Sequence, residues 1–116
     1  MVQKFHFRSF SNLDINKQAD FFINSMDVMS SLETIQAIKN RAITKMDLQI
    51  GDQVLEVGCG HGEDAEKIAN IITEKGRVFA IDSSIRMINE AKKRSTHNNV
   101  IYSLMRAEDL KFQDNL

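Results

Sequence analysis

The stretch of sequence that decides the fold is Val54-Leu55-Glu56-Val57-Gly58-Cys59-Gly60-His61-Gly62. Its first four residues are apolar apart from one acid, and glycine then alternates with other residues. Such a run predicts a buried strand that enters a turn with few side chains, where backbone groups can approach a ligand. Asp82 follows about twenty residues later, after a second apolar run, where an acid can accept hydrogen bonds from both hydroxyls of a ribose. The two features together predict a site for a nucleoside-bearing cofactor.

The acids around the turn indicate which cofactor binds. The pattern is Gly-x-Gly-x-Gly, and Glu63 and Asp64 follow it, so Glu63 stands where a dinucleotide-binding fold has its third glycine. Carboxylates at a helix N-terminus repel a pyrophosphate. Glu56 and Asp82 add a negative lining that suits a ligand with ammonium and sulfonium charges. S-adenosylmethionine is such a ligand.

Two segments resemble the first two motifs of the class I S-adenosylmethionine-dependent methyltransferases, in particular the methyltransferase type 11 or UbiE-like group. They are Glu56–Gly62 and Val78–Ser84. Leu48–Gln53 and Ala107–Phe112 resemble the segments before the first strand and after the third strand of that family. The resemblance covers roughly residues 20–116. It implies an α/β, Rossmann-like parallel sheet and an enzyme that transfers a methyl group.

The resemblance also implies which residues bind the cofactor. They are Glu56, Gly58, Cys59, Gly60, Gly62, Asp82, Ser83, Met87, Ala107 and Glu108. By this comparison Gly58 and Gly60 contact the methionine part through their backbones, and Asp82 holds the ribose. Ser83 and Met87 flank the adenine.

Glu56 has, by the same comparison, an indirect hold on the ammonium group of the cofactor. Methyl transfer from a sulfonium is an in-line displacement, in which an enzyme mainly aligns and desolvates the reactants. The sequence therefore names no catalytic residue.

The sequence departs from the family pattern at two positions. Arg106 stands where many relatives place an acid for the adenine amino group, so Ala107 would contribute its backbone, with Glu108 or Asp109 as a substitute acid. His61 stands where a small hydroxyl residue is commoner, and its simplest interpretation is a loop side chain that faces solvent.

Composition excludes several other classes. The chain has 116 residues, 42% apolar and 27% charged, which predicts one ordinary globular domain. A net charge of -1 offers no basic field for a nucleic acid, and no apolar run is long enough for a membrane span. No secretory signal is recognisable, and the single Cys59 forms no disulfide framework, so we expect a cytoplasmic protein. The three His residues have no metal-ligand spacing, and the neighbouring acids oppose a thiolate nucleophile at Cys59.

Periodicity predicts helices and strands in alternation. We expect a helix over 16–29 and a second one that runs from a Ser30/Glu33 capping box to about residue 46. A third helix should cover 63–74, with a stop at Gly76. A fourth should begin at a Ser83 or Ser84 cap and end at the basic, solvated cluster Lys92-Lys93-Arg94. We expect strands over 53–57, 77–81 and 100–105. Residues 1–47 would form a leading helical cap segment, and residues 48–116 the cofactor-binding domain.

The predicted sheet lacks one strand. With the strand order 3-2-1-4-5 of such folds, the strand at 53–57 is central and needs a neighbour on each side. The chain ends before a fourth strand, so we expect either a piece truncated from a longer protein or a homodimer that pairs this strand or exchanges an element.

Three functions remain open from the sequence. The first is a methyltransferase for a small-molecule or lipid-like acceptor. The second is a non-catalytic module that binds S-adenosylmethionine or a nucleotide, which Arg106 favours. The third is an NAD-dependent oxidoreductase, which Glu63 and the missing third glycine oppose.

Overall fold

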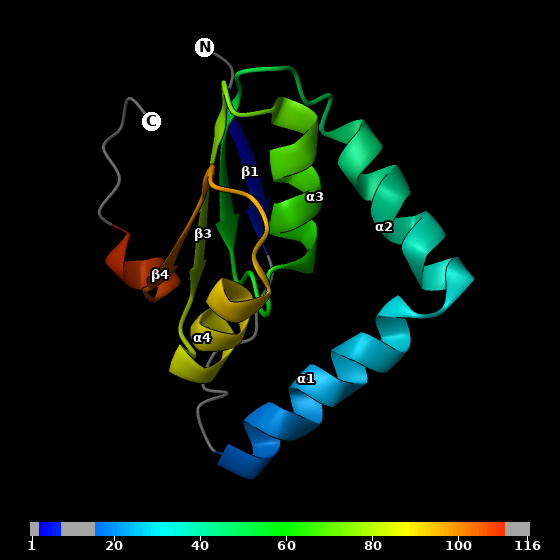
Figure 1. Ribbon diagram of the computed structural model, residues 1–116, viewed down its shortest axis with the longest axis vertical. Helices are drawn as coiled ribbons and strands as arrows, with labels where there is room; N and C mark the ends of the chain where they lie inside the picture. Colours follow the sequence, from blue (N-terminus) through cyan, green and yellow to red (C-terminus); the bar gives the residue numbers. More distant parts are fainter. Residues whose placement is uncertain (1–2, 8–15, 111–116) are drawn as a thin grey trace.

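A computed structural model describes residues 3–7 and 16–110 of the chain. These residues form a parallel sheet with helices beside it (Figure 1). In chain order the elements are β1 (Gln3–Phe7), α1 (Asn16–Ser30), α2 (Glu33–Lys45), β2 (Gln53–Val57), α3 (Glu63–Ile72), β3 (Arg77–Asp82), α4 (Ile85–Arg94), β4 (Val100–Leu104) and the 3-10 helix η1 (Ala107–Asp109). Within these described ranges, no helix has the length and apolarity needed to cross a membrane.

The sheet has the order β1-β2-β3-β4, and every neighbouring pair is parallel. Val54 of β2 lies opposite Val78 of β3, which in turn lies opposite Val100 of β4. Parallel strands joined by helices are the α/β arrangement that the sequence predicts, and β2, β3 and β4 are the three predicted strands. The Rossmann-like fold class is therefore confirmed.

The prediction that residues 53–57 lack a neighbour on one side is wrong. β1 pairs with β2 along that side, with Gln3 opposite Gln53 and Phe7 opposite Val57. β2 therefore forms ladders on both sides, and a homodimer that pairs through this strand loses its basis. The prediction failed because a five-residue strand carries too short a pattern to stand out, and β1 comes from the segment expected to form only leading helices.

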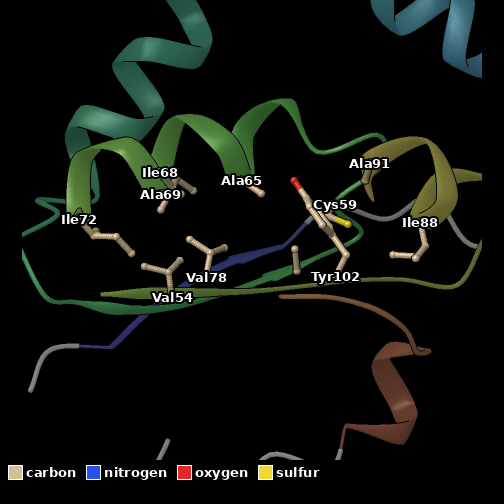
Figure 2. Packing of buried hydrophobic residues seen from close by; sticks show 11 residues of the cluster. Val54, Cys59, Ala65, Ile68, Ala69, Ile72, Val78, Ile88, Ala91 and Tyr102 are labelled. Atoms are coloured by element: carbon tan, nitrogen blue, oxygen red, sulfur yellow. The ribbon is translucent and has the colours of Figure 1, made fainter. Parts of the chain in front are cut away.

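Helices α3 and α4 pack on one face of the sheet. The core there consists of Val54, Cys59, Ala65, Ile68, Ala69, Ile72, Val78, Ala80, Ile88, Ala91 and Tyr102, most of which Figure 2 labels. A smaller cluster of Leu55, Val57 and Ile81 lies on the opposite face. Alternation along the strands explains both clusters, because neighbouring residues of a strand point to opposite faces.

The start of α2 differs from the prediction. Its N-cap is Leu32, which makes no capping hydrogen bond through its side chain, so the predicted Ser30/Glu33 capping box is wrong. Ser30 is instead the last residue of α1, and its hydroxyl donates a hydrogen bond to Glu63 of α3. Ser30 therefore bonds to Glu63, 33 residues away, instead of capping α2.

The ends of α3 and α4 are set by side chains and backbone geometry. α3 ends at Ile72 rather than near Gly76, because Thr73 takes a left-handed φ of 63° and the Asn99 side-chain amide donates to the carbonyls of Ala69 and Thr73. At the start of α4, the Ser84 hydroxyl accepts a hydrogen bond from the Met87 amide at 3.2 Å, as one of the two predicted caps requires.

Candidate cofactor site

The glycine turn, residues 58–62, is bound to the carboxyl end of β3. The amides of Gly58 and Cys59 both donate to the Ile81 carbonyl, at 2.8 and 2.9 Å. Gly60 donates its amide to Asp82 Oδ2 at 2.9 Å. These bonds place a turn that is poor in side chains at the edge of the sheet, beside an acid.

Asp82 is fixed at this edge by two backbone groups. Its side chain is only 1% exposed, and its second oxygen, Oδ1, accepts the Ser84 amide at 2.9 Å. Hydrogen bonds from amides stabilise the charged form of a carboxylate. Asp82 therefore joins the glycine turn to the start of α4.

Glu56 is a second buried carboxylate on the same face of the sheet. It is 0% exposed and lies opposite Ala80, two residues before Asp82 along β3. Burying an ionisable group is costly, so a fully buried acid in a central strand is a candidate for function. Glu56 and Asp82 thus place two buried carboxyl groups at this edge of the sheet.

Gly62 must be glycine for a reason that the sequence does not reveal. Its φ is 93°, and a Cβ added there would lie 2.3 Å from the Tyr102 hydroxyl oxygen. That hydroxyl donates to Glu66 at 2.7 Å, and burial together with Glu66 raises the pKa of Tyr102 far above its usual range. The neutral Tyr102 thus packs against the glycine turn from β4. No local pattern predicts this contact, because the two residues are 40 positions apart.

His61 does not face solvent, so that prediction is wrong. The residue is only 5% exposed, and its Nε2 atom lies 3.3 Å from Asp27 Oδ1 of α1. Burial, followed by the charge of Arg94, lowers the pKa of His61 below 6.5, while the charges of Asp27 and Glu63 act in the opposite direction. The side chain is buried because α1 lies against the turn.

Glu63 occupies the first turn of α3, as predicted, and is held by the leading helices. Gln36 of α2 donates to it at 2.9 Å, and the Lys39 and Lys67 ammonium groups lie 3.5 Å away. Burial alone would raise the pKa of Glu63, but hydrogen bonds from Ser30 and Gln36 and the two lysine charges lower it to about 2. The carboxylate is therefore charged and already paired.

The structure gathers most of the predicted site residues at one edge. Those that lie together are Glu56, Gly58, Cys59, Gly60, Gly62, Asp82 and Ser83, at the carboxyl ends of β2 and β3. Met87 lies one turn further along α4, and its fully buried side chain packs against Ile23 of α1. The Met87 side chain therefore packs against α1, in a place where it was predicted to flank the adenine.

The predicted adenine-edge segment follows β4. Ala107 packs on the small cluster with Leu55, on the opposite face of the sheet. Glu108 and Asp109 are exposed and lie 3.5 and 3.2 Å from the Arg106 guanidinium. Both acids that were expected to substitute for the missing family acid therefore pair with Arg106, which stands in its place. Beside them is an open hollow of about 450 Å³, lined by Leu104, Met105, Arg106, Asp109 and Leu110.

Sequence reasoning missed Asp27 and Arg94, which contact the turn or its neighbours. Asp20 and Asp27 are seven residues apart on α1, and they pair with Arg86 and Arg94, eight residues apart on α4. Acids and arginines at such spacings lie on one face of each helix, so the pairing had a sequence signal. Arg94 is exposed, as predicted for the solvated end of α4, but it also pairs with Asp27.

Several known proteins that resemble this chain are methyltransferases by name. Residues 54–116, more than half of the chain, match the family described as Methyltransferase domain. The chain is 32% identical over 72 residues to a Saccharolobus solfataricus protein named "Probable cobalt-precorrin-6B C(15)-methyltransferase (decarboxylating)", covering 59% of this chain and 36% of that protein. It is 28% identical over 102 residues to the 23S rRNA (uracil(1939)-C(5))-methyltransferase of Acinetobacter baumannii, covering 88% of this chain and 20% of that one.

A solved structure of a protein-L-isoaspartate O-methyltransferase is 27% identical, with a TM-score of 0.57 over 61% of this chain and 23% of that chain. This chain thus spans only 36% and 20% of the length of the two curated relatives named above. The family match and the geometry of the edge agree. The chain belongs to the Methyltransferase domain family of class I S-adenosylmethionine-dependent methyltransferases, and S-adenosylmethionine is the cofactor of that family.

Proposed function

We propose that this protein holds S-adenosylmethionine at the carboxyl ends of β2 and β3 and transfers its methyl group to a small-molecule or lipid-like acceptor. The observation that carries the proposal is the buried Asp82 carboxylate, fixed by the Gly60 and Ser84 amides beside the glycine turn. An acid in that place suits the two hydroxyls of a ribose.

The residues at this edge fit a cationic adenosyl ligand. Glu56 and Asp82 supply two buried carboxyl groups, and charge interactions with a cationic ligand are strong where water is excluded. Gly58 and Gly60 let the methionine part approach the backbone. Ser83 and the segment at Ala107 would flank the adenine.

The bound cofactor supplies an electrophilic methyl group on a sulfonium. The acceptor would take this methyl group through its own lone pair, and the electron pair of the carbon–sulfur bond would remain on sulfur. The protein contributes alignment and exclusion of water, which need no dedicated acid or base.

The class of acceptor is supported by the surface of α1. Exposed apolar side chains gather there and at the following turn, with Phe21 65% exposed and Val28, Met29 and Leu32 also exposed. An apolar surface near a site favours an apolar acceptor, and a net charge of -1 gives little attraction for nucleic acid. The names of the relatives mention a cobalt-precorrin, a ribosomal RNA and an isoaspartate in a protein, so relationship alone does not select the acceptor.

The role of Asp82 is tested by Asp82→Asn. Loss of a charged hydrogen-bond acceptor should weaken cofactor binding by about 1 to 3 kcal/mol in calorimetry. Asp52→Asn is the matched control, because Asp52 is also buried and accepts a backbone amide, that of Gln49 at 2.9 Å, at the other end of β2. The control should lose stability but keep its affinity. Equal affinities for Asp82→Asn and the wild type would reject the ribose role.

The acceptor is tested by labelling. The natural protein is incubated with S-adenosylmethionine carrying a labelled methyl group and with cell extract, which is then separated into small-molecule, lipid, protein and RNA fractions. We expect label in the first or second fraction. Label confined to RNA or protein would contradict the proposed acceptor.

A non-catalytic module that binds S-adenosylmethionine is the second candidate, and Arg106 favours it. This residue replaces a family acid and is engaged by Glu108 and Asp109. Tight cofactor binding without labelling of any fraction would select this candidate.

A further inference from the structure

Asp27 joins three separate parts of the molecule. Its two carboxylate oxygens accept hydrogen bonds from Nη1 and Nη2 of Arg94, at 2.8 and 3.0 Å. Asp27 Oδ1, which accepts the bond from Nη1, also lies 3.3 Å from Nε2 of His61. One side chain of α1 therefore contacts the end of α4 and the middle of the glycine turn.

The pairing with Arg94 is well defined. The Nε atom of Arg94 donates to Glu90 at 2.6 Å. This bond holds the guanidinium while Nη1 and Nη2 of Arg94 donate to Asp27. The hydrogen bond from Arg94 is the largest influence on the pKa of Asp27 and lowers it. Single exposed ion pairs contribute little, but a fork-like pair with fixed geometry is directional. Asp27 is thus held in place to meet His61.

His61 is the residue through which α1 can act on the turn. It lies between Gly60 and Gly62, which are both in left-handed conformations, with φ of 57° and 93°. Glycine backbone moves easily, so a buried ring between two glycines restricts the turn. The amide of Gly60 in turn holds Asp82 Oδ2.

We propose that Asp27 is a positioning residue for the cofactor site: through the His61 ring it fixes the glycine turn, and S-adenosylmethionine affinity depends on this link. Only the dependence of S-adenosylmethionine affinity on this link rests on the proposed function, and the fixing of the turn does not. Because linkage is reciprocal, the bound cofactor should also strengthen the hold of the turn on α1.

A neighbouring ion pair provides the matched control. Asp20 of α1 pairs with Arg86 of α4, so it also joins these two helices, but its carboxylate contacts Arg86 rather than the glycine turn. Asp20→Asn and Asp27→Asn therefore remove the same charge from the same helix. Only Asp27→Asn weakens the contact with His61.

The first measurement is amide hydrogen exchange of the cofactor-free protein by NMR. The Gly60 and Gly62 amides are bonded within the fold, to Asp82 and to the Cys59 carbonyl, so their exchange reports opening of the turn. We expect Asp27→Asn to accelerate both by at least about fivefold relative to Asp20→Asn. Equal exchange in the two variants would overturn the proposal, whether or not the cofactor binds.

The second measurement is calorimetric titration of S-adenosylmethionine. We expect Asp27→Asn to bind at least about fivefold more weakly than Asp20→Asn, and the cofactor to protect α1 amides less in Asp27→Asn than in the wild type. Unchanged affinity in Asp27→Asn would overturn the positioning role. A wild-type protein that does not bind S-adenosylmethionine would instead overturn the proposed function, and the exchange measurement alone would then decide the link between Asp27 and the turn.

Discussion

Gly62 combines two separate requirements at one residue. Its left-handed φ of 93° disfavours any side chain, and the Tyr102 hydroxyl fills the place of a Cβ. Gly51 has nearly the same φ, 90°, but a Cβ there would meet only the Lys75 carbonyl, at 3.9 Å. The two glycines therefore separate backbone strain from steric overlap.

We expect Gly51→Ala to lower the free energy of unfolding by about 1 kcal/mol through backbone strain alone. Gly62→Ala should cost about 2 to 4 kcal/mol, because Tyr102 must also move away from its bond with Glu66. Urea denaturation of both variants measures the difference. Equal losses would mean that Tyr102 does not restrict the turn.

Glu63 gives the protein a stability term that depends on pH. Its pKa is about 2 in the folded protein, below the ordinary value of 4.5, so folding favours the charged form. The contribution to stability is full above pH 4.5 and is lost as the pH falls towards 2. Glu63→Gln should therefore be less stable than the wild type at neutral pH and should lose less stability on acidification.

Denaturation midpoints between pH 7 and pH 3 measure this effect. Glu33→Gln is the control, because Glu33 is exposed at the start of α2. It should follow the wild-type profile. If Glu63→Gln also follows that profile, the contacts from Ser30, Gln36, Lys39 and Lys67 do not stabilise the folded state.

At the scale of elements, β1 completes the sheet. It covers the side of β2 that would otherwise present unpaired backbone groups, and such edges promote association. Proline in the middle of a strand removes a ladder donor, whereas the first residue of a strand tolerates it. Phe5→Pro should therefore free this side of β2, and Gln3→Pro should not.

Sedimentation velocity over a range of concentrations tests the role of β1. We expect Phe5→Pro to associate more strongly than the wild type and to unfold at a lower temperature, with Gln3→Pro close to the wild type. A Phe5→Pro variant that sediments and melts as the wild type does would show that β1 is not needed to cover β2.

The predictable elements are those with long, regular patterns. The region from Gln53 to Leu104 alternates apolar strands with amphipathic helices, and its boundaries agree with the prediction to within about two residues at most ends. β1 was missed because its pattern is short. The capping box failed because Ser30 binds Glu63, 33 residues away, and such tertiary bonds override local preference.

At the scale of the whole molecule, the site lies where the carboxyl ends of parallel strands meet. The Gly-x-Gly-x-Gly pattern and Asp82 predicted that place, because a parallel sheet directs both to the same edge. The environment of His61 was not predictable from its neighbours, since it depends on how α1 crosses the turn and on Asp27. The fold brings α1 and α2, which lie between β1 and β2 in the chain, into contact with the proposed cofactor site.

The central claim is that this edge binds S-adenosylmethionine. The most direct test is calorimetric titration of the wild-type protein with S-adenosylmethionine and, separately, with NAD. We expect saturable binding of one S-adenosylmethionine per chain and no binding of NAD. Absence of S-adenosylmethionine binding by folded protein, or tighter binding of NAD, would contradict the claim.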